Sequence, residues 1–253
     1  MTQLKKTETR VFPDAAAMTR ASADAVAAAA VRCVDARGTF RIALSGGASP
    51  KALFFLLAGE GYRSLPWDRF EVFWGDDRYV PWTHSESNFR GANDLLLTRV
   101  PVPRKNIHPM PTDSKSPFAD ALRYETELRS LFAVPGEGFP ALDFALMGVG
   151  GDGHTASLFP GGPELRESRR WVVSSRSPIG VKDRITMTVP VFNSCREALF
   201  LVEGEGKAEV LREILQGSSP AERFPAKLIQ PADGRLVYML DQAAASRLIG
   251  HPS

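Results

Sequence analysis

The sequence predicts an α/β fold, a doubly wound, mostly parallel sheet with helices on both of its faces. Two observations lead to this prediction. Apolar segments of strand length alternate with segments of helical periodicity along the chain, which is the pattern of βαβ units with right-handed crossovers. The chain also has 253 residues, 43% of them hydrophobic, and shows no internal repeat or low-complexity linker. We therefore expect residues 1–253 to form a single α/β domain.

The first part of the chain carries start and stop signals for its helices. Asp14 follows a proline and precedes an alanine-rich segment with apolar residues on one face, so we expect it to cap a helix that ends at Gly38. Ser49 followed by Pro50 predicts the cap and the first residue of a second helix. The elements expected up to residue 132 are helices over 14–38, 49–57, 85–100 and 116–132, and strands over 39–44 and 70–74.

The second part of the chain continues the alternation. Ile185, Met187 and Val189 alternate with Arg184 and two threonines, which predicts a half-exposed strand rather than a central one. This period places Arg184 on one face of the strand, toward a candidate site. The other elements expected here are strands over 142–147, 171–174, 198–202 and 236–240, and helices over 207–215 and 242–249.

Composition argues against several classes of function. The formal net charge of +2 is too small for a nucleic-acid surface, which needs a clustered basic face. No 18-residue apolar run could span a membrane, and residues 1–10 lack the apolar core of a secretory signal. We therefore expect a cytoplasmic protein without nucleic-acid or membrane partners. Cys33 and Cys195 have no metal-type spacing and are expected to be buried thiols, and the four scattered histidines predict no structural zinc site.

The segment 142–160 (LDFALMGVGGDGHTASLFP) carries the strongest indication of a functional site. An apolar run of buried-strand length ends in glycines and is followed by Asp152 and His154. Ligands of open α/β sheets bind in the crevice beyond the carboxyl ends of the strands, and imidazoles are the usual general bases. A core histidine is the alternative, but a glycine-flanked loop is a poor place to bury an imidazole.

The same segment also matches the dinucleotide-binding pattern G-x-G-x-x-G, through Gly148, Gly150 and Gly153. Three features argue against a dinucleotide. Asp152 would place a carboxylate against the pyrophosphate, and Pro160 comes too early for the long helix that this fingerprint needs. The acidic residue expected about 20 positions later is missing as well. We therefore expect a Rossmann-like sheet without a dinucleotide site.

Two further loops at strand ends contain residues that could bind a ligand. The segment 45–50 (SGGASP) joins glycines to a helix start and can form an anion pocket, most simply for a phosphate, although a plain strand-to-helix turn is the alternative. The segment 75–78 (GDDR) sets two carboxylates beside Arg78, whose guanidinium suits phosphate or carboxylate oxygens, although surface ion pairing is the alternative. Because parallel strands share one carboxyl edge, we expect these loops and the His154 loop to meet in one cleft.

Five ordered blocks, spread over nearly the whole chain, occur together in one known family. They are residues 44–50, residues 74–81 followed by His84, Ser87 and Asn88, and residues 147–160, 184–188 and 199–207. With these blocks the chain resembles the 6-phosphogluconolactonases of the pentose phosphate pathway. It departs in one place, because the loop after Trp74 more often reads Asp-Glu-Arg in that family and here has Asp77.

The resemblance implies that water, activated by His154 as general base, attacks the carbonyl of 6-phospho-D-glucono-1,5-lactone to give 6-phosphogluconate. Asp152 would hold the imidazole or its turn, with a purely structural role left open. The resemblance implies no cofactor or metal, a sugar-phosphate lactone as the small-molecule partner, and a monomer or homodimer. The implied substrate-binding and phosphate-binding residues are Ser45, Gly46, Gly47, Asp76, Arg78, Arg184 and Lys207, with Asp76 fixing Arg78 or the sugar hydroxyls. Whether Ser45 or Asn88 touches the ligand stays open.

Two alternatives of different kinds remain. Glucosamine-6-phosphate deaminases share the scaffold, but Phe159 stands where their corresponding turn has a glutamate, and a phenyl ring cannot relay a proton. A non-catalytic sugar-phosphate sensor of a transcription regulator would need a helix-turn-helix, for which the single alanine-rich helix before Thr39 leaves no room.

Overall fold

The structure is a computed structural model that describes residues 7–250. Its larger sheet has seven strands, β1 (Thr7–Phe12), β2 (Phe40–Leu44), β3 (Phe70–Trp74), β5 (Ile107–His108), β6 (Phe144–Met147), β9 (Glu197–Val202) and β10 (Arg235–Asp241). Their order is β1-β10-β9-β6-β2-β3-β5, and every neighbouring pair is parallel. The expected doubly wound parallel sheet is confirmed.

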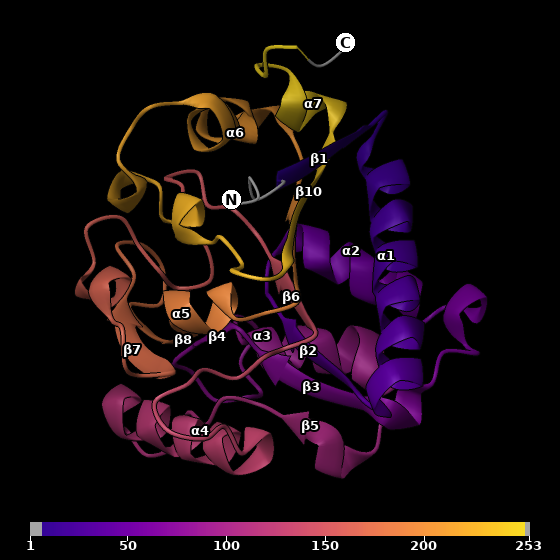
Figure 1. The fold of residues 1–253 in the computed structure, drawn as a ribbon, viewed down its shortest axis with the longest axis vertical. Helices are drawn as coiled ribbons and strands as arrows, with labels where there is room; N and C mark the ends of the chain where they lie inside the picture. Colours follow the sequence, from indigo (N-terminus) through magenta and orange to yellow (C-terminus); the bar gives the residue numbers. More distant parts are fainter. Residues whose placement is uncertain (1–6, 251–253) are drawn as a thin grey trace.

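A second, three-stranded sheet stands beside the larger one (Figure 1). It consists of β4 (Asp76–Arg78), β7 (Val172–Arg176) and β8 (Asp183–Met187). Its order is β4-β8-β7, and both pairs are antiparallel. The strand expected over 171–174 therefore exists but does not belong to the parallel sheet.

The helices are α1 (Ala15–Arg37), α2 (Ala48–Leu57), α3 (Asn88–Ala92), α4 (Pro117–Phe132), α5 (Val189–Asn193), α6 (Ala208–Gln216) and α7 (Gln242–Ala245). The predicted limits of α1 are confirmed. The carboxylate of Asp14 accepts a hydrogen bond of 2.7 Å from the amide of Ala17, and Gly38 ends the helix in the left-handed region with φ 78°. Such a cap stabilises a helix by about 1 kcal/mol.

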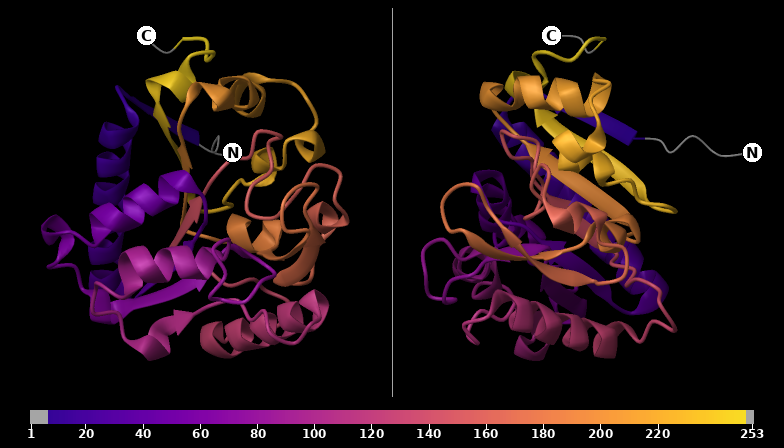
Figure 2. Two further views of the ribbon diagram at one scale, coloured as in Figure 1. Left: turned by 180° about the vertical axis from the view of Figure 1, so that it is seen from behind. Right: turned by 90° about the vertical axis from the view of Figure 1, so that its left-hand side faces the viewer.

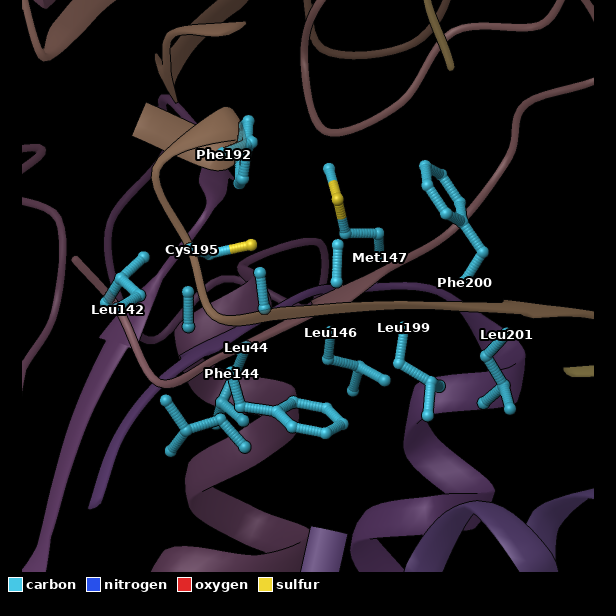
Figure 3. Close-up of a cluster of buried hydrophobic side chains, with 14 of the residues drawn as sticks. Leu44, Leu142, Phe144, Leu146, Met147, Phe192, Cys195, Leu199, Phe200 and Leu201 are labelled. Carbon is cyan, nitrogen blue, oxygen red and sulfur yellow. The ribbon is translucent and has the colours of Figure 1, made fainter. Parts of the chain in front are cut away.

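The core lies on both faces of the large sheet. Figure 3 shows Met147 and Phe200 pointing to one face, and Leu146, Leu199 and Leu201 pointing to the other, as the period of two in a strand requires. Helices α1 and α2 cover one face, whereas α5 and the small sheet lie toward the opposite side (Figures 1 and 2). Because both faces are covered, the central strands are apolar runs instead of alternating ones.

The order of the strands creates a switch point between β2 and β6. From β2 the chain adds β3 and β5 on one side, then returns to add β6, β9 and β10 on the other. The loops that leave β2 and β6 consequently diverge at the carboxyl edge of the sheet. Open α/β sheets bind their ligands in the crevice at such a point.

Strand β8 corrects one expectation. It is the middle strand of the small sheet, and Arg184, Ile185, Thr186 and Met187 are all buried. The polar members of the alternation are satisfied inside the protein, since the hydroxyl of Thr186 donates to the carbonyl of Met187 (2.9 Å) and that of Thr188 to the carbonyl of Arg170 (2.8 Å). The prediction of a half-exposed, non-central strand is therefore wrong.

Other differences lie at the ends of elements. Strand β1 begins at Thr7, where no strand was predicted, and residues 1–6 lie outside the described range. Helix α2 begins earlier than expected, at Ala48, and Gly47 occupies the cap position that was predicted for Ser49. Helix α3 starts after Ser87 and continues as a π-helical turn (Asn93–Leu97), while α7 ends at Ala245.

Within residues 7–250, no helix combines the length and the apolar character that crossing a bilayer requires. Cys33 and Cys195 are both buried free thiols, as expected. Burial raises the pKa of each thiol, that of Cys195 to about 12.

Candidate active site

A cavity of about 520 Å³ opens at the carboxyl edge of the large sheet, where the small sheet faces the switch point. It is lined by almost all of the residues that the sequence analysis selected, namely Ser45, Gly46, Gly47, Asp76, Arg78, His154, Arg184 and Lys207. Asp152 is the exception and reaches the cavity through its contact with His154. The three loops expected to meet in one cleft do so.

The loop after β6 presents the imidazole of His154. The Asp152 carboxylate accepts hydrogen bonds from the His154 amide (Oδ1···N 3.1 Å) and from its ring (Oδ1···Nδ1 2.5 Å). Burial raises the pKa of Asp152, but these hydrogen bonds and the charge of the His154 ring outweigh burial and leave that pKa below its ordinary value. Because an ionised carboxylate only accepts hydrogen bonds, the proton of the neutral imidazole is on Nδ1, and this tautomer leaves the lone pair on Nε2.

The loop after β2 supplies the free amides of a helix start. Gly47 adopts φ 110° as the cap residue of α2, and within the described chain no side chain caps that helix. Gly46 lies so close to Asn88 that an added Cβ would be 1.8 Å from its Oδ1. The glycines therefore let two loops meet tightly and leave the first amides of α2 available to an anion.

The two acidic residues after β3 point to different environments. Asp76 is buried beside the cavity, where its Oδ2 accepts from the Ser157 hydroxyl (2.7 Å) and its Oδ1 from the side-chain amide of Asn88 (3.3 Å). Asp77 turns the other way and accepts from the amides of Arg78, Asn88 (both 2.7 Å) and Phe89 (3.0 Å). It thereby ties β4 to the start of α3.

Burial raises the pKa of Asp77 to about 6, and the charge of Asp76 adds to this rise, while the amide hydrogen bonds oppose it. Asp77 is 1% exposed and does not line the cavity. The difference from the family pattern at this position thus concerns the anchoring of α3, not a direct contact with a ligand.

Two arginines project from the small sheet into the cavity. Arg78 on β4 and Arg184 on β8 are register partners. Burial, and then the charge of Arg78, lower the pKa of Arg184. Within the described chain Arg78 donates to the carbonyl of Glu86 (2.7 Å) and not to Asp76, so the first of the two roles expected for Asp76, fixing Arg78, is wrong, and contact with the sugar hydroxyls stays a prediction. Neighbouring cations repel each other, and a dianionic phosphate between them would remove that cost.

The far wall of the cavity is formed by the segment after β9. Burial lowers the pKa of Lys207, against the attraction of Asp152, which places this ammonium on the His154 side. Glu203, the residue directly after β9, also lines the cavity and accepts a hydrogen bond from the Ser49 hydroxyl (2.8 Å). The cavity is thus lined both by cations (Arg78, Arg184 and Lys207) and by carboxylates (Asp76 and Glu203).

Several cavity residues were not selected from the sequence. Glu203 follows a parallel strand at the site edge, so its position alone could have indicated it. Ser45 and Asn88, left open as alternatives, both line the cavity. Ile179 comes from the turn between β7 and β8, whose antiparallel pairing gave no signal in the sequence. Within residues 7–250, no cluster of three or more histidine, cysteine or acidic side chains could hold a metal ion.

Comparisons with known proteins agree with this geometry. A family model described as glucosamine-6-phosphate isomerases/6-phosphogluconolactonase matches residues 13–238. The 6-phosphogluconolactonase of Synechocystis sp. is 44% identical over 220 residues, 86% of this chain and 88% of that protein. The 6-phosphogluconolactonase of Nostoc sp. is 40% identical over 249 residues, 97% of this chain and 99% of that protein.

Solved structures are similar over the same extent. The structure of 6-phosphogluconolactonase from Trypanosoma brucei has a TM-score of 0.86 at 26% identity, and the match covers 97% of this chain and 100% of that one. The family model matches residues 13–238, and the two relatives are 40–44% identical over most of both chains, so the chain belongs to the glucosamine-6-phosphate isomerase/6-phosphogluconolactonase family.

Proposed function

We propose that the protein hydrolyses 6-phospho-D-glucono-1,5-lactone to 6-phosphogluconate in the oxidative pentose phosphate pathway. The observation that carries this proposal is the pairing of His154 with Asp152 in the same cavity as Arg78 and Arg184. The first pair suits activation of water, and the second suits a terminal phosphate. The names of the relatives at 40–44% identity support the same activity.

In the proposed reaction, Nε2 of His154 takes a proton from a water molecule while the water oxygen attacks the lactone carbonyl carbon. The tetrahedral intermediate then collapses, the bond between the carbonyl carbon and the ring oxygen breaks, and the ring oxygen takes the proton back from Nε2 of His154 to become a hydroxyl, which returns the imidazole to its neutral form. The product carboxylic acid loses its proton to solvent. A positioned base contributes about 10²- to 10⁴-fold, which complements an ester that is already reactive.

Asp152 supports this step by holding Nδ1, so that the imidazole stays in the tautomer with a free Nε2. The ionised carboxylate also stabilises the imidazolium that forms when His154 takes the proton. Lys207, half-buried on the same side of the cavity, is placed to attract the developing oxyanion or the substrate phosphate.

The phosphate is proposed to bind between Arg78, Arg184 and the amides that follow Gly46 and Gly47. Charge-assisted hydrogen bonds to guanidinium groups and helix-start amides are the usual means of phosphate recognition. Asp76 would accept hydrogen bonds from the sugar hydroxyls, because Asn88 and Ser157 already hold its carboxylate in place. We also propose a cytoplasmic location, where sugar phosphates are retained by their charge, and a monomer or homodimer.

The proposal is tested by giving the pure protein two substrates in separate assays. Acid release from 6-phosphogluconolactone above the spontaneous rate, without ammonia release from glucosamine 6-phosphate, is the expected result. Ammonia release would identify a deaminase. Binding of 6-phosphogluconate without turnover of either substrate would identify a sensor, and either result would overturn the proposal.

A further inference from the structure

The imidazole of His154 lies directly against the backbone of Gly150. A Cβ built on Gly150 would be 2.0 Å from Nδ1, 2.1 Å from Cε1 and 2.7 Å from Oδ1 of Asp152. Side-chain carbons do not approach other atoms this closely. The hydrogen bond between Asp152 and His154 therefore occupies the space that any larger residue at position 150 would fill.

Gly150 cannot move away from this contact without opening the turn. Its amide donates to the carbonyl of His154 (2.8 Å), and its carbonyl accepts from the amide of Gly153 (3.0 Å). The residue that touches the ring is thus bonded to the backbone of the same histidine. Ring and glycine are held together by covalent and hydrogen-bonded connections within five residues.

Phe159 provides a second contact to the ring. Its phenyl centroid lies 4.8 Å from that of the imidazole with the planes inclined at 46°, and the residue is buried. Phe159 is itself fixed, because its amide approaches Oε1 of the buried Glu164 (3.4 Å) and its carbonyl accepts from the amide of Gly162 (3.0 Å). The backbone of Phe159 is therefore anchored, and its buried ring has neighbours that restrict its movement.

We propose that Gly150 and Phe159 are positioning residues that hold the His154 ring with Nδ1 on Asp152 and Nε2 toward the cavity. This inference rests on the proposed function of His154. Both residues line the cavity, but neither has a group that transfers protons, so we expect each to act on the reaction through the orientation of the imidazole. A ring that can rotate loses the Asp152 hydrogen bond, and displacements of about 1 Å can cost about 100-fold in rate.

The first test measures turnover of the lactone by two variants. Gly150→Ala and Phe159→Leu should each lower kcat about 10- to 100-fold, while the Kd for 6-phosphogluconate changes less than about threefold. Phe159→Tyr keeps the flat ring and should keep kcat within about threefold of the wild type. If Gly150→Ala does not fold, the two Phe159 variants still decide the matter.

Two control variants separate positioning from general destabilisation. Gly61→Ala adds a methyl group at a glycine where nothing among the described residues lies within 4 Å. Phe40→Leu removes a buried ring at the end of β2 remote from the cavity. Both should keep kcat, although Phe40→Leu should lower the thermal stability. Wild-type kcat in Phe159→Leu, or equal losses in Phe159→Leu and Phe40→Leu, would overturn the inference.

The second test does not depend on activity. Ring-nitrogen NMR at pH 8 on the ¹⁵N-histidine-labelled protein should show His154 in the tautomer protonated at Nδ1, and the chain has four histidines to distinguish. Gly150→Ala and Phe159→Leu should show a mixture of tautomers. An unchanged His154 signal in both variants would overturn the positioning role even if the protein is a lactonase. Conversely, if the wild type does not hydrolyse the lactone but the tautomer of His154 changes in the two variants as expected, the result would count against the proposed function alone.

Discussion

His154 has its Nδ1 bonded to Asp152 and lines the cavity, and its replacement tests the proposed chemistry most directly. His154→Ala should lower kcat for the lactone by about 10²- to 10⁴-fold, because water would lose its proton acceptor. Binding of 6-phosphogluconate, measured by calorimetry, should change little. Turnover near the wild-type rate, after subtraction of spontaneous hydrolysis, would remove His154 from the mechanism.

Arg78 is expected to act on the phosphate and not on the carbonyl. Arg78→Ala should weaken kcat/KM for the phosphorylated lactone by about 1.5 to 3 kcal/mol, the range for a hydrogen bond to a charged group, and leave gluconolactone nearly unchanged. Arg90→Ala, which removes an exposed arginine from α3, is the matched control. Equal losses on both lactones would show that Arg78 maintains its loop, and the phosphate would then belong to Arg184 and Lys207.

The start of α3 depends on a buried carboxylate. Because the pKa of Asp77 is raised to about 6, its contribution to stability is present below about pH 4 and is lost as the pH rises through 6. A shift of about two pKa units corresponds to about 3 kcal/mol. Asp77→Asn removes the titration, so the variant should gain about 2 to 3 kcal/mol relative to the wild type between pH 4 and 7.5.

Urea unfolding of both proteins at the two pH values measures this difference. The constant effect of the lost hydrogen bonds cancels, since only the change with pH is compared. A difference that does not vary with pH would mean that the amides of Arg78, Asn88 and Phe89 keep Asp77 ionised throughout.

Local signals in the sequence were sufficient for elements whose ends are decided by neighbouring residues. Asp14 and Gly38 bound α1, and Ser116 caps α4, because caps and stops act within one turn. Likewise the site loops could be predicted, since the glycines and charged residues follow apolar strands directly. The positions of Ser45, Arg78 and His154 in one cavity followed from the parallel arrangement of β2, β3 and β6.

Elements that depend on distant partners could not be predicted in the same way. The alternation of apolar and polar residues in β8 is compatible with one solvent-exposed face. Only the internal hydrogen bonds of Thr186 and Thr188 allow the polar face to be buried. Strand β4 has three residues and exists because β8 pairs with it. The hydrogen bond from Ser49 to Glu203 joins positions 154 apart in the sequence, so no local sequence pattern predicts it.

The cavity joins the two sheets, so ligand binding should couple them. At 100 times its Kd, 6-phosphogluconate should raise the free energy of unfolding by about 2.7 kcal/mol and raise Tm accordingly. Amide exchange should slow in β8 of the small sheet as well as at the start of α2. Gluconate, which lacks the phosphate, is the control and should protect neither. Protection confined to the loops of the large sheet would place the phosphate away from Arg184.

Strand β1 pairs along its length with β10, with Thr7 opposite Leu236 and Phe12 opposite Asp241. On the ribosome, the first strand emerges long before its neighbour exists, and at about 5 to 20 residues per second the wait is on the order of tens of seconds. Glu8 and Arg10, which pair with each other, make that waiting segment polar and a poor template for association with other nascent chains. Strand β1, although it is made first of the seven, can therefore join the edge of the large sheet only after translation has delivered residue 241.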